Sequence, residues 1–484
     1  MRAAAALALV ALALVLVLAS CGGSSSRTSD RGGSTVVATW HDPDGDGFLT
    51  RGAGEPLRDR TDLARAVAPA RTLATLAVLT DAHVRDEESP ARVPFLDRLG
   101  GPFSSTFRPQ EALSAQVLDA AVRSVNAARP DAVLVTGDLV DNAQANELAL
   151  ARTVLDGGRA DPDSGARGYQ GVQAAADPDP AYYRPDVDPP RHRGLLDDAQ
   201  RPFRATGLRA PWYAVPGNHD LLVAGELART PSTAAVAVGG ERLVTPDAGL
   251  DVPRSENALT PQLVDSALSG GLPGTTARVA PDPARRELTP QEAVAGLRAA
   301  SGHGGSGARM DDAFDAGRAV RVIVLDTVRR DVGSGGVLSA EQTQWLSRQL
   351  AAAGKRRVIV VSHQPLTSVD GGQAALALLD ADRHVVAALA GDSHHNRVVA
   401  RHTATGGYWL VQTAALADYP QQGRMLRVRA APGGGTVLET WMLDTAPDPL
   451  ADTARELAYL DAQGGRPQGE AGTAKDRNVR LYVP

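Results

Sequence analysis

Five short polar motifs, each placed where an apolar run of the chain ends, constrain the fold more than any other feature. These motifs contain Asp81 with His83, Asp138 with Asp141, Asn218 with His219, His363, and Asp392 with His394. Carboxylate and amide oxygens mixed with imidazoles, all delivered from strand ends, suit a pair of divalent cations with room for a water between them. The pattern therefore predicts a two-metal hydrolase.

The apolar runs alternate with helical stretches, which predicts an α/β sandwich. We expect strands over residues 36–40, 73–80, 132–136, 212–215, 320–325, 358–361 and 385–390. Helices are expected over 111–128 and 338–353, and the second has Ser339 as its N-cap and Gly354 as its stop. Residues 408–413, 425–428 and 437–443 follow as strands without intervening helices, and we expect them to extend a second sheet.

Two long segments, about 156–208 and 224–318, interrupt this alternation and are rich in Pro, Gly, Asp and Arg. Loops of that length inside a compact domain are usually functional or disordered. Because they flank the Asn218-His219 motif, we expect them to build a substrate cleft. We place the catalytic domain at residues 35–450 and a C-terminal extension at 451–484.

The N-terminal residues have the pattern of an export signal. Arg2 precedes an apolar run over residues 3–19, and Leu18-Ala19-Ser20-Cys21 then leads into a Gly/Ser-rich stretch. The run resembles a bacterial lipoprotein signal, with residues 1–20 removed, Cys21 lipidated and residues 21–34 serving as a flexible tether. Cys21 is the only cysteine, so an internal disulfide is excluded. We therefore expect a protein that is lipid-anchored on the outer face of a membrane, or one that is secreted.

The charge balance and the glycine motifs exclude several functional classes. A net charge of −6 with interspersed signs gives no footprint for binding nucleic acid. The glycine-rich stretches have no Walker lysine and no Rossmann spacing, which disfavours nucleotide-dependent transfer.

Asp42, Asp44 and Asp46 alternate with turn residues, as in a calcium loop. However, the twelfth position holds Ala53, and Glu55 lies two residues too far along. A plain Asx turn therefore competes with a calcium site.

Within the motifs, Asp81 and His83 are two residues apart. On an extended chain their side chains therefore point the same way and could bind one cation. Gly137 allows a sharp turn beneath Asp138, which is well placed to bridge two ions. Asp141 is expected either to cap the next helix or to support a ligand.

Asn218 can ligate a metal without adding charge. His219, if it stays off the metal, could donate a proton to a leaving oxygen, with Asp220 orienting its ring.

Taken together, the motifs resemble those of the calcineurin-like metallophosphoesterase superfamily over residues 73–399: Asp-x-His, Gly-Asp-x-x-Asp, Gly-Asn-His-Asp, an isolated His, and a variant of Gly-His-x-His. The resemblance implies a four-layer α/β/β/α sandwich of two mixed sheets and two divalent ions, with Mn, Fe, Zn and Mg as candidates. It implies that Asp81, His83, Asp138 and His394 bind one ion, and that Asp138, Asn218, His363 and one further ligand bind the other. It also implies that a metal-bridging hydroxide attacks phosphorus while His219 protonates the departing alcohol.

The last motif departs from the family, because Gly391-Asp392-Ser393-His394-His395 carries an aspartate where the family has its first histidine. Asp392 could still coordinate a hard cation. Alternatively, a bulge could change the roles of His394 and His395, or the second site could be weakened.

From these observations we expect a hydrolase of phosphate esters, either monoesters or diesters, acting on a small-molecule or polymer substrate. The competing hypothesis is a surface-anchored binding protein, inactive or weakly active, whose second metal site is degenerate.

Overall fold

The computed structural model describes residues 33–99, 106–177, 179, 181–250, 253, 258–305, 307–465 and 470–484. The expected signal peptide, Cys21 and nearly all of the tether lie outside the described residues. Among those that are described, no helix combines the length and apolar character needed to cross a membrane.

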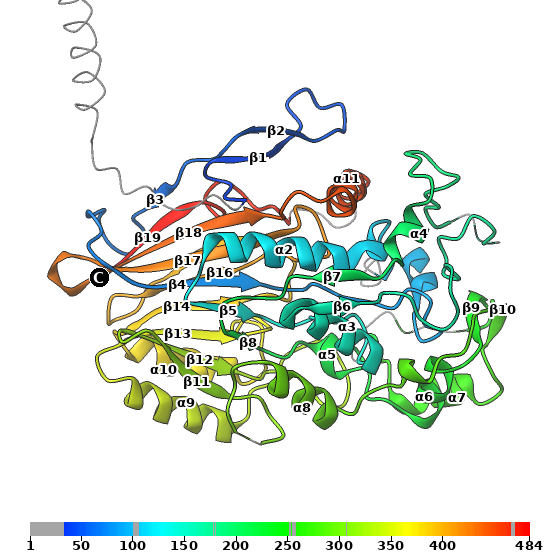
Figure 1. The fold of residues 1–484 in the computed structure, drawn as a ribbon. Helices are drawn as coiled ribbons and strands as arrows, with labels where there is room; N and C mark the ends of the chain where they lie inside the picture. The colour runs from blue at the N-terminus through cyan, green and yellow to red at the C-terminus, as the bar shows by residue number, and fades with distance from the viewer. Residues whose placement is uncertain are drawn as a thin grey trace, which may run out of the picture. The chain divides into compact units, whose positions relative to one another are not determined.

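Two mixed sheets form the centre of the fold (Figure 1). The first has seven strands in the order β3-β19-β18-β17-β4-β5-β8, and the second has six in the order β11-β12-β13-β14-β16-β15. The strands of the first sheet are β3 (Arg58–Arg60), β4 (Thr72–Leu79), β5 (Ala132–Val135), β8 (Trp212–Ala214), β17 (Gln422–Ala430), β18 (Thr436–Asp444) and β19 (Val479–Val483). Those of the second are β11 (Asp312–Ala316), β12 (Val320–Leu325), β13 (Arg357–Ser362), β14 (Val385–Ala390), β15 (Arg397–Arg401) and β16 (Tyr408–Gln412).

Alternating apolar side chains explain why the two sheets stack and why helices cover them. In β4, Leu76 and Val78 belong to a buried cluster that joins both sheets, whereas Ala77 and Leu79 belong to a cluster shared with helices. The helices α2 (Ser114–Ala128), α3 (Ala145–Asp156) and α11 (Pro449–Gln463) contribute to that second cluster, and α9 (Ala340–Ala353) and α10 (Gly372–Ala381) pack on the six-stranded sheet. The four-layer α/β/β/α sandwich is therefore confirmed (Figure 1).

Most of the expected elements are present with bounds shifted by one or two residues. β12 and β14 match their expected ranges, and α9 begins after Ser339, whose hydroxyl accepts from the backbone N–H of Gln342. The helix expected over 111–128 begins as a short 3-10 turn, Glu111–Leu113, before α2.

Two expectations about the C-terminal third were wrong. The strands after residue 408 do not all extend one second sheet, because β16 joins β14 while β17 pairs with β4 of the other sheet. Residues 451–484 are not a separate extension either. β19 pairs with β18 along five residues, and α11 packs on α2. The backbone hydrogen bonds of β18 need this partner, so the end of the chain completes the seven-stranded sheet.

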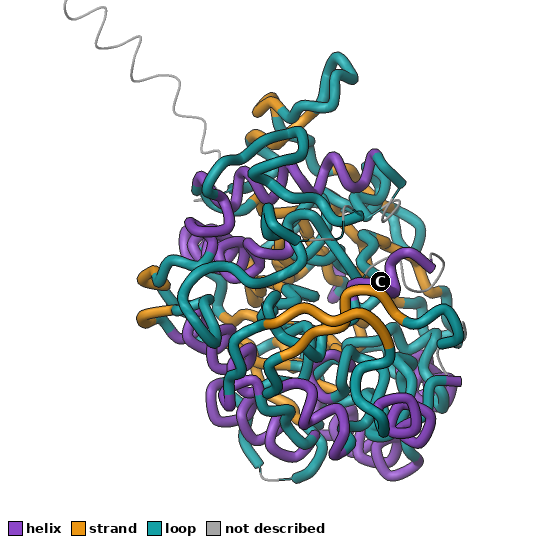
Figure 2. Tube along the Cα trace, turned by 90° about the vertical axis from the view of Figure 1, so that its right-hand side faces the viewer, coloured by secondary structure: helices purple, strands orange, loops and turns teal. Residues whose placement is uncertain are grey.

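The two long insertions contain short elements joined by loops, which appear as teal tube in Figure 2. The first carries β6 (Gly158–Ala160), α4 (Leu195–Ala199) and β7 (Phe203–Ala205). The second carries α6 (Pro231–Ala237), β9 (Glu241–Pro246), α7 (Pro261–Leu268), β10 (Gly274–Arg278), a 3-10 turn at Pro283–Arg285 and α8 (Pro290–Ala300). A further 3-10 turn covers Pro94–Leu99, another covers Pro432–Gly434, and near the N-terminus β1 (Ala38–His41) pairs with β2 (Thr50–Ala53).

Candidate metal centre

The five motifs converge where strands of both sheets end. Asp81 and His83 follow β4, Asp138 follows β5, His363 follows β13, and Asp392 and His394 follow β14. Asn218 opens the short helix α5 (Asn218–Leu221) after β8. The sequence thus correctly predicted that these residues come together.

The backbone of the centre is held in an unusual conformation. Asp81, His83, Asp138, Asp392 and His394 all have positive φ, between 44° and 66°, which L-residues rarely adopt. Such conformations cost free energy and persist only where the surrounding structure imposes them, typically at functional sites.

Glycines allow the loops to approach closely. A Cβ at Gly217 would lie 2.2 Å from the backbone nitrogen of Asp138, and one at Gly137 would lie 2.3 Å from the ring of His363. A Cβ at Gly391 would lie 2.6 Å from the carboxylate of Asp81. Larger residues at these positions would push the candidate ligands apart.

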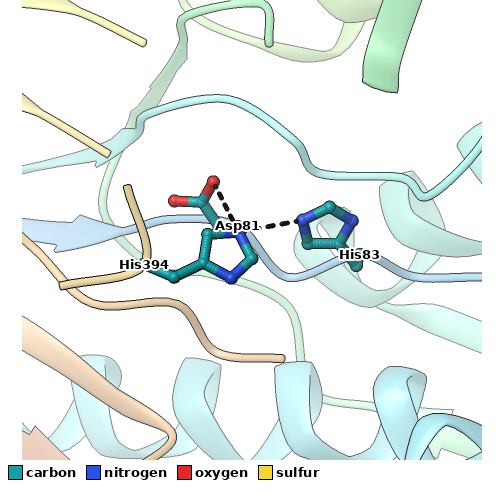
Figure 3. A group of neighbouring side chains, drawn as sticks. All are labelled: Asp81, His83 and His394. Carbon is teal, nitrogen blue, oxygen red and sulfur yellow. Dashed lines mark hydrogen bonds and ion pairs between the residues drawn. The ribbon is translucent and has the colours of Figure 1, made fainter. Parts of the chain in front are cut away.

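The first ligand group consists of Asp81, His83 and His394 (Figure 3). The Nε2 atoms of the two histidines are 3.3 Å apart, and Nε2 of His394 lies 3.5 Å from Oδ1 of Asp81. Asp138 reaches the same group, with Oδ2 3.8 Å from Nε2 of His83. These spacings match those between neighbouring ligands that share one ion at about 2.0 to 2.2 Å.

The inferred tautomers of these histidines leave a place for a proton or a cation between them. Nδ1 of His83 lies 3.0 Å from Asp141, and Nδ1 of His394 lies 2.5 Å from Asp418. Carboxylates accept only, so each Nδ1 carries the proton and each Nε2 lone pair points at the other. Two facing lone pairs at 3.3 Å repel unless a proton or a cation lies between them.

The second ligand group surrounds His363. Its Nε2 lies 3.2 Å from Oδ1 of Asn218 and 3.3 Å from Oδ2 of Asp138. Its Nδ1 donates to the carbonyl oxygen of Thr136 at 2.8 Å, which leaves the Nε2 lone pair free for a metal. Asp138 thus contacts both groups, as a bridging ligand must.

Asp392 lies at the edge of the second group. Its Oδ1 is 3.7 Å from Nε2 of His363, and its backbone N–H donates to Asp81 at 3.2 Å. The backbone is therefore fixed, while the side chain stays 29% exposed and free to turn toward an ion. His394 takes the position expected of it, so the motif is not rearranged by a bulge that removes this histidine from the first group.

His219 lies beside the first group, with its ring centroid 4.7 Å from that of His83. The expectation that Asp220 orients this ring was wrong. Asp220 accepts instead from the backbone N–H groups of Gly217 and Val140, and Nδ1 of His219 contacts the carbonyl oxygen of Asp141 at 2.6 Å. Asp220 therefore fixes the turn that presents the motif, because its carboxylate satisfies two buried backbone donors.

Asp141 proved to be a supporting residue and not a helix cap. Gln144 is the N-cap of α3, while the carboxylate of Asp141 contacts His83 and accepts from Arg85 at 2.6 Å.

Burial and charge set opposite protonation states within the centre. Burial lowers the pKa of His83 to about 4. The pKa of His394 rises to about 10, because Asp418 and Asp81 outweigh the effect of its burial. Burial also raises the pKa of Asp392 to about 6, against the attraction of His363. Without ions, a proton on His394 thus occupies the position between the two imidazoles, and a divalent cation would replace it.

Sequence reasoning missed Asp418 and Arg108. Asp418 is fully buried between Nδ1 of His394 and the guanidinium of Arg108, whose Nε lies 2.5 Å away. Neither residue belongs to a motif or has a sequence neighbour in the centre, so no local pattern marks them.

Two further groups of polar side chains contact backbone atoms. In the 42–46 loop, both carboxylate oxygens of Asp42 accept backbone N–H groups, as in an Asx turn. Asp42, Asp44 and Asp46 also bring their carboxylate oxygens within 4.8 Å of one another, so the calcium site stays a prediction. His303 is buried, with its ring nitrogens contacting Asp312 and the carbonyl oxygen of Ala214.

Comparison with known proteins gives three findings. Residues 74–251 match the family model described as calcineurin-like phosphoesterase. No curated protein matches the chain. A crystal structure of a dimetal phosphatase from Danio rerio is matched at 14% sequence identity and a TM-score of 0.38, covering 78% of this chain and 100% of that one. By this family match, residues 74–251 of the chain are similar to the calcineurin-like phosphoesterases.

Proposed function

We propose that the protein hydrolyses phosphate monoesters or diesters at a two-metal centre. Asp81, His83, Asp138 and His394 would hold one ion, and Asp138, Asn218, His363 and Asp392 the other. The observation that carries this proposal is the convergence of two ligand groups on one carboxylate, Asp138.

The donor atoms suit Mn, Fe, Zn or Mg. Both groups mix imidazole nitrogen with carboxylate or amide oxygen, and neither contains a thiolate. When bound, the ions would supply Lewis acidity that polarises phosphoryl oxygens and promotes the ionisation of water at neutral pH.

His219 would protonate the departing alkoxide. Its Nδ1 is engaged by the carbonyl oxygen of Asp141, so its proton on that atom is fixed and Nε2 is the atom available to the substrate. Its backbone N–H donates to Oδ1 of Asp138 at 2.9 Å, which ties the acid to the bridging ligand.

The second insertion would form one wall of the substrate cleft. It begins directly over the centre: the carbonyl oxygen of Gly225 accepts from the side chain of Asn218, and a Cβ at Gly225 would lie 2.4 Å from the ring of His219. Substrate selection between small molecules and polymers would then depend on this segment.

The proposed acid can be tested through the leaving group. With Mn²⁺ added, the protein should hydrolyse aryl phosphate or bis-aryl phosphate. His219→Asn should lower kcat by roughly 100-fold or more for phenyl or alkyl leaving groups, and far less for nitrophenol, which departs without a proton. An equal loss for all leaving groups would contradict the assignment of His219.

The alternative is a metal-binding protein with a degenerate second site, and it is supported by the aspartate at position 392, whose side chain is 29% exposed. If no substrate is hydrolysed with any of the metals, and Asp392→His does not restore hydrolysis, the alternative is favoured.

We also propose that the protein works outside the cytoplasm, attached through a lipid on Cys21. The apolar run over residues 3–19 and the position of the single cysteine after it support this proposal. Labelled fatty acid should be incorporated by the native chain and not by Cys21→Ser.

A further inference from the structure

The histidines of the two ligand groups are supported differently. In the first group, His83 and His394 each donate Nδ1–H to a carboxylate, that of Asp141 and that of Asp418. In the second group, His363 donates Nδ1–H to the neutral carbonyl of Thr136. All three arrangements fix the tautomer, but only a carboxylate also makes the imidazole a stronger metal donor.

Arginines hold both supporting carboxylates in place. Arg108 binds Asp418 through two nitrogens, Nε at 2.5 Å and Nη2 at 3.2 Å, and Arg85 binds Asp141 through Nη2 at 2.6 Å. Both arginines also contact Glu111: Arg85 through its guanidinium at 2.6 Å and Arg108 through its backbone N–H at 2.9 Å.

These contacts form one network with equal numbers of positive and negative groups. We call it the arginine network; its members are Arg85, Arg92, Arg108, Glu111, Asp141 and Asp418. Arg92 completes it by donating to Oε1 of Glu111 at 2.7 Å. Five of its six members are buried and Asp141 is partly exposed, and because the charges balance, the carboxylates stay ionised and fixed behind the two imidazoles.

The candidate ligands of the second group have fewer charged partners than those of the first. It contains one histidine, a neutral amide from Asn218 and the partly exposed Asp392. We infer that the two sites are unequal, so that the first site binds its ion more tightly and fills first, with Asp418 and Arg108 as its positioning residues. This inference rests on the two-metal centre proposed above.

Metal titration of the full chain tests whether the two sites differ in affinity. Metal-free protein is titrated with Mn²⁺, followed by calorimetry and by the EPR signal of free Mn²⁺. We expect two classes of site whose Kd values differ by at least about 10-fold. His394→Ala should remove the tight class, and His363→Ala should remove the weak class.

Asp418→Asn tests the positioning residue. It keeps the shape of the side chain but removes its charge, so the tight Kd should rise by roughly 10- to 100-fold while the weak Kd stays unchanged. Because this variant leaves Arg108 buried without its partner, the double variant Arg108→Gln/Asp418→Asn, which replaces the ion pair by two neutral amides, should show the same selective loss with the fold retained.

A matched control comes from another buried arginine–carboxylate pair. Arg242 binds Asp177 in the insertions, and both residues are buried. Asp177→Asn should leave both Kd values unchanged.

The possible outcomes separate this inference from the proposed function. Three results would contradict the difference in affinity between the two sites while leaving the two-metal centre intact. They are two classes with equal Kd values, loss of the tight class in His363→Ala, and equal weakening of both classes in the Asp418 variants. Absence of any stoichiometric binding would overturn the two-metal centre itself.

Discussion

Two groups of buried charges lie next to each other in the chain and are organised in opposite ways. The charged loop, residues 85–92, begins two residues after His83, and its charged side chains are all buried. There each charge meets a group of opposite sign or a hydrogen-bond donor, as in the contact of Asp86 with Arg285 at 2.8 Å. In the metal centre, by contrast, candidate ligand atoms face one another, as in the two Nε2 atoms 3.3 Å apart.

The two arrangements of buried charge have different consequences. Charges of opposite sign that contact each other stabilise the folded chain. Carboxylates and imidazoles that converge on one point instead repel one another unless a cation binds between them. Substitutions in the two regions should therefore separate activity from stability.

The largest expected effect is that of Asp138→Ala. Since Asp138 contacts both ligand groups, its removal should lower kcat/KM for aryl phosphates by roughly 1000-fold or more. The free energy of unfolding of the metal-free protein should fall by only about 1 to 3 kcal/mol, because the backbone N–H of His219 loses its acceptor. Rates with saturating Mn²⁺ and urea unfolding measure the two effects; retained activity would show that Asp138 is not the shared ligand.

The next effect, on stability, is that of Arg285→Ala. Arg285 is fully buried and donates to Asp86, to Ser164 at 2.7 Å and to the carbonyl oxygen of Ala280 at 2.7 Å. Its removal leaves the buried carboxylate of Asp86 without its counter-charge, so urea unfolding should show a loss of about 3 to 5 kcal/mol.

The adjacent residue provides a matched control for Arg285. Arg286 pairs with Glu292 at 3.0 Å on the surface, and Arg286→Ala should cost less than about 1 kcal/mol. Equal losses in the two variants would mean that the charged loop contributes no special stability.

The same contrast explains how much of the molecule could be predicted from its sequence. Apolar runs and the Ser339 cap are local patterns, so β12, β14 and α9 were predicted within a residue or two. The candidate metal ligands come together as expected because each occupies the end of such a run. β19 was missed because Val479–Val483 is a short run interrupted by Arg480, and its pairing with β18 makes it part of the sheet.

The supporting groups could not be predicted because they depend on contacts between distant segments. His394 and Asp418 are brought together across the β15-β16 hairpin, and Arg108 reaches them from a loop 310 residues away. The prediction that Asp220 orients the ring of His219 was wrong for a related reason. The two residues are neighbours in the sequence, but the carboxylate of Asp220 accepts backbone N–H groups instead. Likewise, nothing in the run Arg85-Asp86-Glu87-Glu88 indicates burial, since such runs are usually solvated.

The smallest effect should come from Glu88 in the charged loop and should depend on pH. Burial raises the pKa of Glu88 from 4.5 to about 7, although Gln200 and Arg285 oppose the rise. Between pH 4.5 and 7 the folded protein thus keeps a proton that the unfolded chain releases, so the free energy of unfolding falls as pH rises and levels off above pH 7.

Glu88→Gln mimics the protonated carboxyl and should remove this fall. At pH 7.5 the variant should be more stable than the native protein by on the order of 1 to 3 kcal/mol, and at pH 4.5 the two should be equal. Urea unfolding of metal-free protein at both pH values measures the difference. Glu292 offers a control of opposite sign, because the backbone N–H of Thr289 lowers its pKa, so Glu292→Gln should not gain stability at pH 7.5. If Glu88→Gln is destabilising at pH 7.5, Glu88 is ionised there, and its contact with Arg285 at 3.7 Å then stabilises the fold.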